Sequence, residues 1–296
     1  MKKLVTLLSL LSIFLNFSFF AQTEDPVVIE KAPQKLRFGL KGFSSIGWLS
    51  PDNERSLTRG KLGLGFGWGL NTELYINKTT CFRTGFSLST YSAGLNYNDN
   101  EKTSNLEAYK DSYYVINNAE FQLWESDSVI PNGNLHKLNS RKYNLSYLNI
   151  PLILKLKTKE IGYMTYFGEF GGILGLKTKA SVEDSHILIN PDTTLNGELL
   201  FPVQNSPTTP DNDFNFNDVS QPIRAGLCLG AGAEYNFSGS TSLFFQLNWN
   251  YFMTNMMKKQ EKDNYLRNFN NDSKKFESVN SKAIPGSFHL TVGILF

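Results

Sequence analysis

The chain has 296 residues, of which 41% are hydrophobic, 14% aromatic and 19% charged, and its mean hydropathy is -0.28. This hydropathy is too low for a protein that crosses a membrane with several helices, whereas a β-barrel needs apolar residues only at alternate strand positions. The formal net charge of +2 gives no reason to expect nucleic acid as a partner.

The amino-terminal segment has the layout of a cleavable secretory signal. Two lysines precede an uncharged apolar run over residues 4–20, and the sequence then becomes polar. An uncleaved anchor is the alternative, because the run is long enough to span a bilayer as a helix. We expect three parts: a signal peptide at 1–21, a periplasmic lead-in at 22–35 and a β-barrel at 36–296.

Eight segments of alternating apolar and polar or small residues follow the lead-in. Such alternation predicts β-strands with one apolar face. In the clearest segment, 61–76, glycines alternate with Leu62, Leu64, Phe66, Trp68 and Leu70. The expected strands lie at about 36–48, 61–76, 80–97, 143–157, 161–177, 221–237, 243–253 and 283–296.

The lengths of the connections favour a membrane barrel. Those after the second, fourth and sixth strands are short, and those after the third, fifth and seventh are long. Outer-membrane barrels have short periplasmic turns and long external loops. The sequence therefore predicts an all-β, eight-stranded antiparallel transmembrane β-barrel in the bacterial outer membrane, with both termini in the periplasm. A soluble sandwich or lipocalin-like barrel is the alternative, but soluble barrels keep a polar exterior.

Aromatic residues near the strand ends predict a girdle at each membrane interface. Those at the ends next to long loops are Tyr91, Tyr97, Tyr143, Tyr147, Trp249 and Tyr251. Those at the ends next to short turns are Tyr75, Phe82, Tyr163, Tyr235, Phe237 and Phe296.

Charged residues occupy positions that the alternation turns inward. The cations are Arg37, Lys41, Arg83, Lys155 and Arg224, and the carboxylates are Glu73, Glu169 and Glu234. Eight strands enclose a lumen that side chains fill, and buried charges must be paired. We therefore predict a structural charge network that fixes the barrel register, in preference to a proton or ion path.

The histidines do not suggest an active site. His136 and His186 fall in expected external loops, and His289 points inward from the last strand. No spacing brings a nucleophile, a base and an orienting acid together. We expect no enzymatic activity and no cofactor.

Metal and disulfide sites are not expected either. Asp211, Asp213 and Asp218 do not reproduce a known calcium-binding loop. Cys81 and Cys228 lie on strands that are well separated around an eight-stranded barrel, so we expect two free thiols.

The long loops differ in charge. Residues 178–220 are mostly acidic, and residues 256–282 are rich in lysine. Two interpretations stay open: solvated loops in contact with lipid and lipopolysaccharide, or a surface that docks secretion-machinery or surface proteins.

Residues 147–155, Tyr-Leu-Asn-Ile-Pro-Leu-Ile-Leu-Lys, resemble the "Y-L-x-I-P-L-L-L-K" segment of PorT-like outer-membrane β-barrel proteins of Bacteroidota. With the signal peptide, the glycine-rich strands and the aromatic carboxyl terminus, the resemblance covers most of the mature chain. It implies an eight-stranded barrel in a family that includes a component needed for type IX protein secretion and, in gliding bacteria, for export of surface adhesins. Pro151 is unusual for a paired strand and predicts a bulge or a locally unpaired position.

These observations predict a non-enzymatic outer-membrane barrel with an accessory or scaffold role in type IX-like secretion or in envelope assembly. The alternative is a small barrel that binds or modifies a lipid or a small hydrophobic ligand.

Overall fold

The computed structural model describes residues 36–51, 57–97, 112–117, 120–121, 132–189, 194–195, 198–199, 211–215, 220–258, 266–270, 275–278 and 282–296. The expected signal peptide and lead-in lie outside these residues. The chain divides into two compact units, Met1–Pro33 and Gln34–Phe296, and every described element belongs to the second. In the described ranges, no helix has the length and apolar character needed to cross a membrane.

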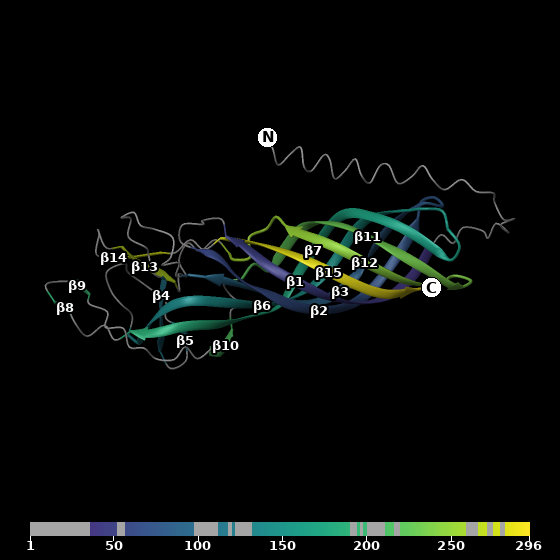
Figure 1. Cartoon of the computed structure of the whole chain (residues 1–296). Coiled ribbons are helices and arrows are strands. Elements are labelled where there is room, and N and C mark those ends of the chain that lie inside the picture. The colour runs from purple at the N-terminus through teal and green to yellow at the C-terminus, as the bar shows by residue number, and fades with distance from the viewer. Residues whose placement is uncertain are drawn as a thin grey trace, which may run out of the picture. The chain divides into compact units, whose positions relative to one another are not determined.

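Eight long antiparallel strands form a closed barrel (Figure 1). They are β1 (Leu36–Pro51), β2 (Thr58–Tyr75), β3 (Thr80–Asn96), β6 (Asn134–Lys157), β7 (Met164–Ile189), β11 (Ile223–Ser238), β12 (Thr241–Phe252) and β15 (Ala283–Leu295). Each of these strands pairs with the next one along the chain, and β15 pairs with β1 to close the ring. The predicted eight-stranded antiparallel barrel is confirmed.

The register of the strands fixes the width of the barrel. A path that starts at Arg37 and steps from each residue to its cross-strand partner returns to β1 at Gly47, ten residues further along. Eight strands with this stagger are tilted to the barrel axis and leave an interior that side chains fill.

The outer face of the barrel is apolar, as the alternation predicts. Leu64 is 69% exposed and Leu290 is 57% exposed, whereas Gly65 and Thr291 next to them are buried. A continuous exposed apolar surface of this kind is stable only in a nonpolar medium such as the lipid bilayer.

The ladder to β3 is interrupted at Pro151, in line with the predicted unpaired position, whereas on the other side Pro151 stays in register with Ile173 of β7. The ladder between β3 and β6 runs to Arg83↔Ile153 and resumes at Ser87↔Asn149 in the same register. Pro151 lacks the N–H that a central strand donates. Its partner position in this register is Gly85, whose φ of 137° is a conformation that L side chains rarely adopt.

The strands β6 and β7 extend well past the apolar band, which corrects the prediction that residues 98–142 and 178–220 are loops. Residues 134–142 and 178–189 are paired strand. Short strands join this region or lie in the same long connections (Figure 1): β4 (Ser112–Asn117), β5 (Glu120–Phe121), β8 (Thr194–Leu195), β9 (Glu198–Leu199), β10 (Asp211–Asn215), β13 (Arg267–Asn270) and β14 (Lys275–Ser278). We call residues 134–147 of β6 and 177–189 of β7, with β4, β10 and β13, the extracellular sheet.

The distribution of apolar and polar residues between the two faces of β6 reverses along the strand. In the membrane-facing part, Leu152 and Leu156 point out, and Asn149 and Lys155 point in. In the extracellular sheet, Tyr143 and Leu145 occupy the inward positions, and Lys142 is exposed. Water replaces lipid outside the bilayer, so the apolar residues turn to the inside.

The predicted aromatic girdles are mostly right on one side and mostly wrong on the other. At the ends next to the short turns, Tyr163, Phe237 and Phe296 are well exposed, and Tyr235 is 39% exposed. Phe82 is half-buried, and Tyr75 is a wrong prediction, because its hydroxyl lies inside the lumen against Glu73 and Lys157. At the opposite ends, only Trp249 and Tyr251 face outward, because four tyrosines have inward parity and are buried: Tyr91, Tyr97, Tyr143 and Tyr147.

Candidate functional site in the barrel lumen

An ion cluster fills the lumen near the short turns. The Lys155 ammonium donates hydrogen bonds to Glu73 Oε1 and Glu234 Oε1, each at 2.5 Å. Lys157 reaches Glu234 Oε2 at 2.7 Å, and Arg37 reaches the same oxygen at 3.3 Å. These residues come from β1, β2, β6 and β11, so the cluster links strands that are not neighbours in the sheet. We call these five residues the turn-side cluster.

Arg83 and Glu169 form a second buried ion pair in the lumen. Arg83 Nη2 donates to Glu169 Oε1 at 2.6 Å. The amides of Asn248 and Gln246, on β12, donate to the same carboxylate oxygen. All four side chains are buried. The cation and the two amides thus give this buried carboxylate oxygen three hydrogen-bond donors, as a buried charge requires.

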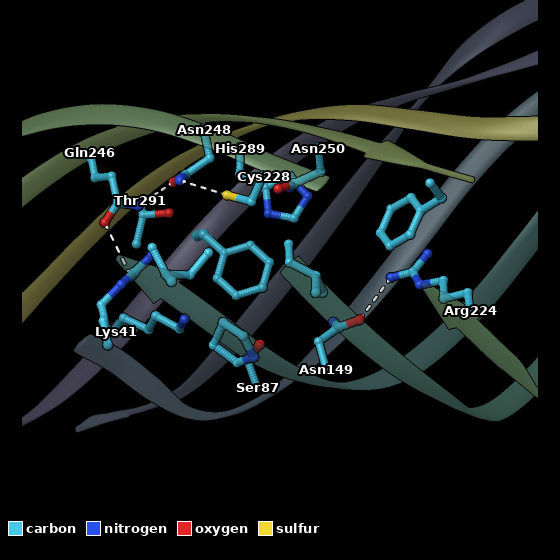
Figure 2. A pocket seen from close by; sticks show the side chains of 16 residues that line it. Lys41, Ser87, Asn149, Arg224, Cys228, Gln246, Asn248, Asn250, His289 and Thr291 are labelled. Atoms are coloured by element: carbon cyan, nitrogen blue, oxygen red, sulfur yellow. Dashed lines mark hydrogen bonds between the residues drawn. The ribbon is translucent and has the colours of Figure 1, made fainter. Parts of the chain in front are cut away.

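A cavity of about 50 Å³ lies next to this pair. Its polar lining includes Lys41, Asn149, Arg224, Asn250 and His289 (Figure 2). Its apolar lining consists of Phe43, Pro151, Ile153, Ile173 and Phe252. A water molecule needs roughly 10–15 Å³ on this measure, so the cavity holds a few water-sized species.

Arg224 is held by aromatic rings and one amide. Its guanidinium carbon lies 3.6 Å from the Tyr147 ring centroid and 3.9 Å from that of Phe252. Its Nη2 donates to Asn149 Oδ1 at 3.0 Å. Arg224 and Lys41 were both expected in the charge network, but neither forms an ion pair with a carboxylate among the residues that the structure describes.

His289 shares the lumen with Ser287, its neighbour on the inward face of β15. The Ser287 hydroxyl and His289 Nε2 are 3.0 Å apart, and the His289 ring stacks on Phe43 with centroids 5.0 Å apart. Ser287 is fully buried. Among the described residues, no carboxylate forms a hydrogen bond with His289 that would orient it as a catalytic base.

The extracellular end of the barrel is filled by an apolar core, which we call the outer plug. It contains Leu49, Leu57, Tyr91, Ala93, Leu95, Tyr97, Leu138, Tyr143, Leu145, Tyr147, Ala180, Val182, Met256, Met257, Leu266 and Ala283. The hydroxyls of Tyr97 and Tyr143 are hydrogen-bonded to each other. Arg141 and Asp184, paired across β6 and β7, form a bidentate ion pair with both N···O distances at 2.6 Å.

His136 and His186 meet in the extracellular sheet, not in loops as expected. Their ring centroids are 4.6 Å apart and the rings are nearly perpendicular. Burial, and then the neighbouring His186, lower the pKa of His136 to about 4. The His136 ring is therefore neutral at neutral pH.

Sequence reasoning missed several lumen residues. Lys157 has the same inward parity as Lys155, so the alternation itself contains the signal that would have found it. Gln246 and Asn248 occupy inward positions of β12 in the same way. By contrast, the Arg141–Asp184 pair falls in segments without the membrane pattern, so it depends on a register that the sequence does not reveal.

The remaining candidate residues contribute no site. Cys81 and Cys228 are both buried and free. Residues 211–215 form β10, which pairs with β7, and Asp218 lies outside the described residues. Within the described ranges, no group of three or more His, Cys, Asp or Glu residues gathers around a point.

The sequence of the chain matches the model of the outer membrane protein beta-barrel domain family over residues 20–258. The chain belongs to this family. The barrel is therefore a bacterial outer-membrane protein, in agreement with its apolar exterior and its alternating short and long connections.

Several solved outer-membrane barrels are similar to this one. Neisserial surface protein A has 12% identity, with 87% of this chain and 95% of that chain covered and a TM-score of 0.36. The attachment invasion locus protein Ail of Yersinia pestis has 11% identity, with 89% and 100% covered and a TM-score of 0.28. The outer membrane protease OmpT of Escherichia coli has 10% identity, with 91% and 99% covered and a TM-score of 0.32. No curated protein sequence is similar enough to the chain to count as a match.

Proposed function

We propose that the protein is a closed, non-enzymatic outer-membrane barrel whose extracellular sheet docks a protein partner in secretion or envelope assembly. The observation that carries this proposal is the filling of the lumen at two levels. The turn-side cluster closes one end and the outer plug closes the other, so the surface that remains for function lies outside the bilayer.

A transport role through the lumen is disfavoured by its contents. Moving a solute would require breaking ion pairs whose side chains are at most 9% exposed in the turn-side cluster. Removing one partner of a buried pair costs about 3–5 kcal/mol. The outer plug would have to open as well, which would expose apolar side chains to water.

Catalysis in the lumen is disfavoured by the surroundings of the Ser287–His289 pair. A serine nucleophile needs an oriented base and access to substrate. Ser287 is fully buried, and His289 stacks on Phe43 without a hydrogen bond to a carboxylate of the described residues. The polar and cationic lining of the cavity also does not suit a small hydrophobic ligand.

The extracellular sheet supports docking because it is large and has an edge. Within the described residues, β10 ends the strand order next to β7. An exposed strand edge pairs readily with an extended segment of another protein. The resemblance of residues 147–155 to PorT-like proteins of Bacteroidota supports a partner in type IX-like secretion.

Site-specific photocrosslinking in the native outer membrane tests this proposal. A photoreactive amino acid at Lys142 or Lys179, which are exposed on the extracellular sheet, is expected to give one discrete protein adduct. The same probe at Lys159, in the short turn after β6, is the matched control and is expected to give none. Secretion-machinery subunits in the adduct would establish the role. Adducts with lipid alone would favour the lipid-binding alternative, and adducts only from Lys159 would place the partner in the periplasm and overturn the proposal.

A further inference from the structure

The membrane-embedded part of the lumen contains more positive than negative charge. Within the described residues, its cations are Arg37, Lys41, Arg83, Lys155, Lys157 and Arg224, and its carboxylates are Glu73, Glu169 and Glu234. The formal excess is three positive charges. Charges removed from water need opposite charge nearby, because hydrogen bonds alone do not replace the lost solvation.

Two cations contribute most clearly to this excess. Glu73 and Glu234 are engaged by the turn-side cluster, and Glu169 is engaged by Arg83. Among the described residues, no ion pair joins Lys41 to a carboxylate. In the part of the chain that the structure describes, the Arg224 guanidinium interacts with aromatic rings and with the Asn149 amide oxygen, and it forms no ion pair.

Lys41 and Arg224 line the same cavity. Figure 2 shows them at opposite ends of it, with His289 and Asn149 between them. His289 lines the cavity with them and brings no negative charge to it. The cavity is thus the place where the uncompensated charge of the lumen is concentrated.

The walls also contain unused hydrogen-bond donors. Arg224 is 4% exposed, and its Nε and Nη1 have no partner among the described residues. A buried guanidinium N–H without an acceptor is costly. Water would satisfy these donors but would leave the positive charge uncompensated, whereas an anion satisfies both.

We infer that the cavity is a binding site for a small monovalent inorganic anion of the chloride class, which lies between Lys41 and Arg224 and compensates their positive charge. The volume of about 50 Å³ admits such an ion with one or two waters and excludes nucleotides and lipid headgroups. The anion is a structural counter-ion for the lumen. This inference does not depend on the docking role proposed above.

An anion that binds the folded state alone stabilises it by mass action, which gives the first test. The full chain, folded in detergent micelles, is heated in sodium chloride and in sodium gluconate at equal ionic strength. A saturable rise of the unfolding midpoint with chloride is expected. A midpoint that depends on ionic strength alone, with no difference between the two salts, would overturn the inference.

Variants assign the effect to the cavity. Lys41→Met and Arg224→Met are each expected to weaken chloride binding by roughly tenfold or more, since each removes a buried charge. Lys41→Arg keeps the charge and is expected to retain binding. Lys159→Met, at an exposed turn position, is the control and is expected to behave as the unchanged protein. Equal chloride affinity in Lys41→Met and the unchanged protein would contradict the assignment.

A bromide soak keeps the test independent of whether the variants fold. Crystals of the unchanged protein in sodium bromide are expected to show an anomalous peak inside the cavity, between Lys41 and Arg224. A cavity that contains only water at saturating bromide would refute the site directly.

Discussion

At the scale of single residues, Gly85 is a position where the backbone conformation strongly restricts which amino acid can be accommodated. It lies opposite Pro151 in the interrupted part of the β3–β6 ladder, and its φ is 137°. A Cβ placed there would collide with the Leu70 carbonyl oxygen across the sheet. Glycine and proline therefore form a matched pair, because the proline cannot donate to the ladder and the glycine accepts the distorted backbone.

Gly85→Ala is expected to lower the free energy of unfolding by about 1–3 kcal/mol, the usual cost of a residue held in a sparsely populated backbone region. Urea unfolding in phospholipid vesicles, followed by tryptophan fluorescence, measures this change. The matched control is Gly42→Ala, since a Cβ at Gly42 meets nothing within 4 Å. Equal effects of the two substitutions would show that the conformation at Gly85 is not the cause.

Lys155 is the residue on which the turn-side cluster depends most. Its ammonium lies between two carboxylates at 2.5 Å each and 4.0 Å from the Phe167 ring centroid. Lys155→Met leaves Glu73 and Glu234 without their shared cation, so a loss of about 3–5 kcal/mol is expected in the same urea assay. Glu234 keeps its ion pairs with Lys157 and Arg37, so Glu73 is the carboxylate left without an ion-pair partner. Adding Glu73→Gln removes that charge and is expected to restore part of the loss. A double variant no more stable than Lys155→Met would argue against charge as the cause.

At the scale of elements, β6 shows which features of a strand can be predicted from the sequence and which cannot. Most of the strand was predictable, because outward aliphatic residues from Leu148 to Leu156 alternate with residues that face the lumen. Its first nine residues were not, because outside the bilayer the exposed face is polar and the pattern no longer marks a membrane strand. The inward charges were predictable from parity, but their partners were not, because pairing across the lumen depends on the ten-residue stagger of the closed ring.

The extracellular part of β6 should respond to acid. His136 has a folded-state pKa of about 4 against an ordinary value of 6.5, so its neutral form is the one that the fold accommodates. The stability that it contributes is complete above pH 6.5 and falls as the pH drops from 6.5 to 4, by about 3 kcal/mol at most. Hydrogen exchange of the amides in 134–147 is expected to accelerate between pH 7 and pH 5 beyond the intrinsic pH effect. His136→Gln should abolish this excess, and an unchanged excess in that variant would assign the response to another group.

At the scale of the whole molecule, the barrel contains two different interiors stacked along one axis. In the bilayer the lumen is polar and ionic, as an interior enclosed by lipid-facing strands has to be, and the exterior is apolar. Above the bilayer the order is inverted, and the outer plug resembles the core of a soluble sheet protein. The same eight-stranded ring thus presents an apolar exterior to lipid in one part and a polar exterior to water in the other. Neither part leaves an open path along the axis.

This arrangement predicts that the reconstituted protein does not conduct ions. In planar lipid bilayers, the purified full chain is expected to give no discrete current steps above the lipid background, since an eight-stranded lumen filled by buried ion pairs and the outer plug leaves no continuous water column. The chloride-class ion inferred above would be trapped between the two closures and would not permeate. A variant that replaces Lys155, Glu73 and Glu234 with serine opens only the turn side and should stay silent, because the outer plug is intact. Steps from the unchanged protein would show that the plug opens in a membrane, whereas steps from the triple variant alone would show that the turn-side cluster is the principal barrier.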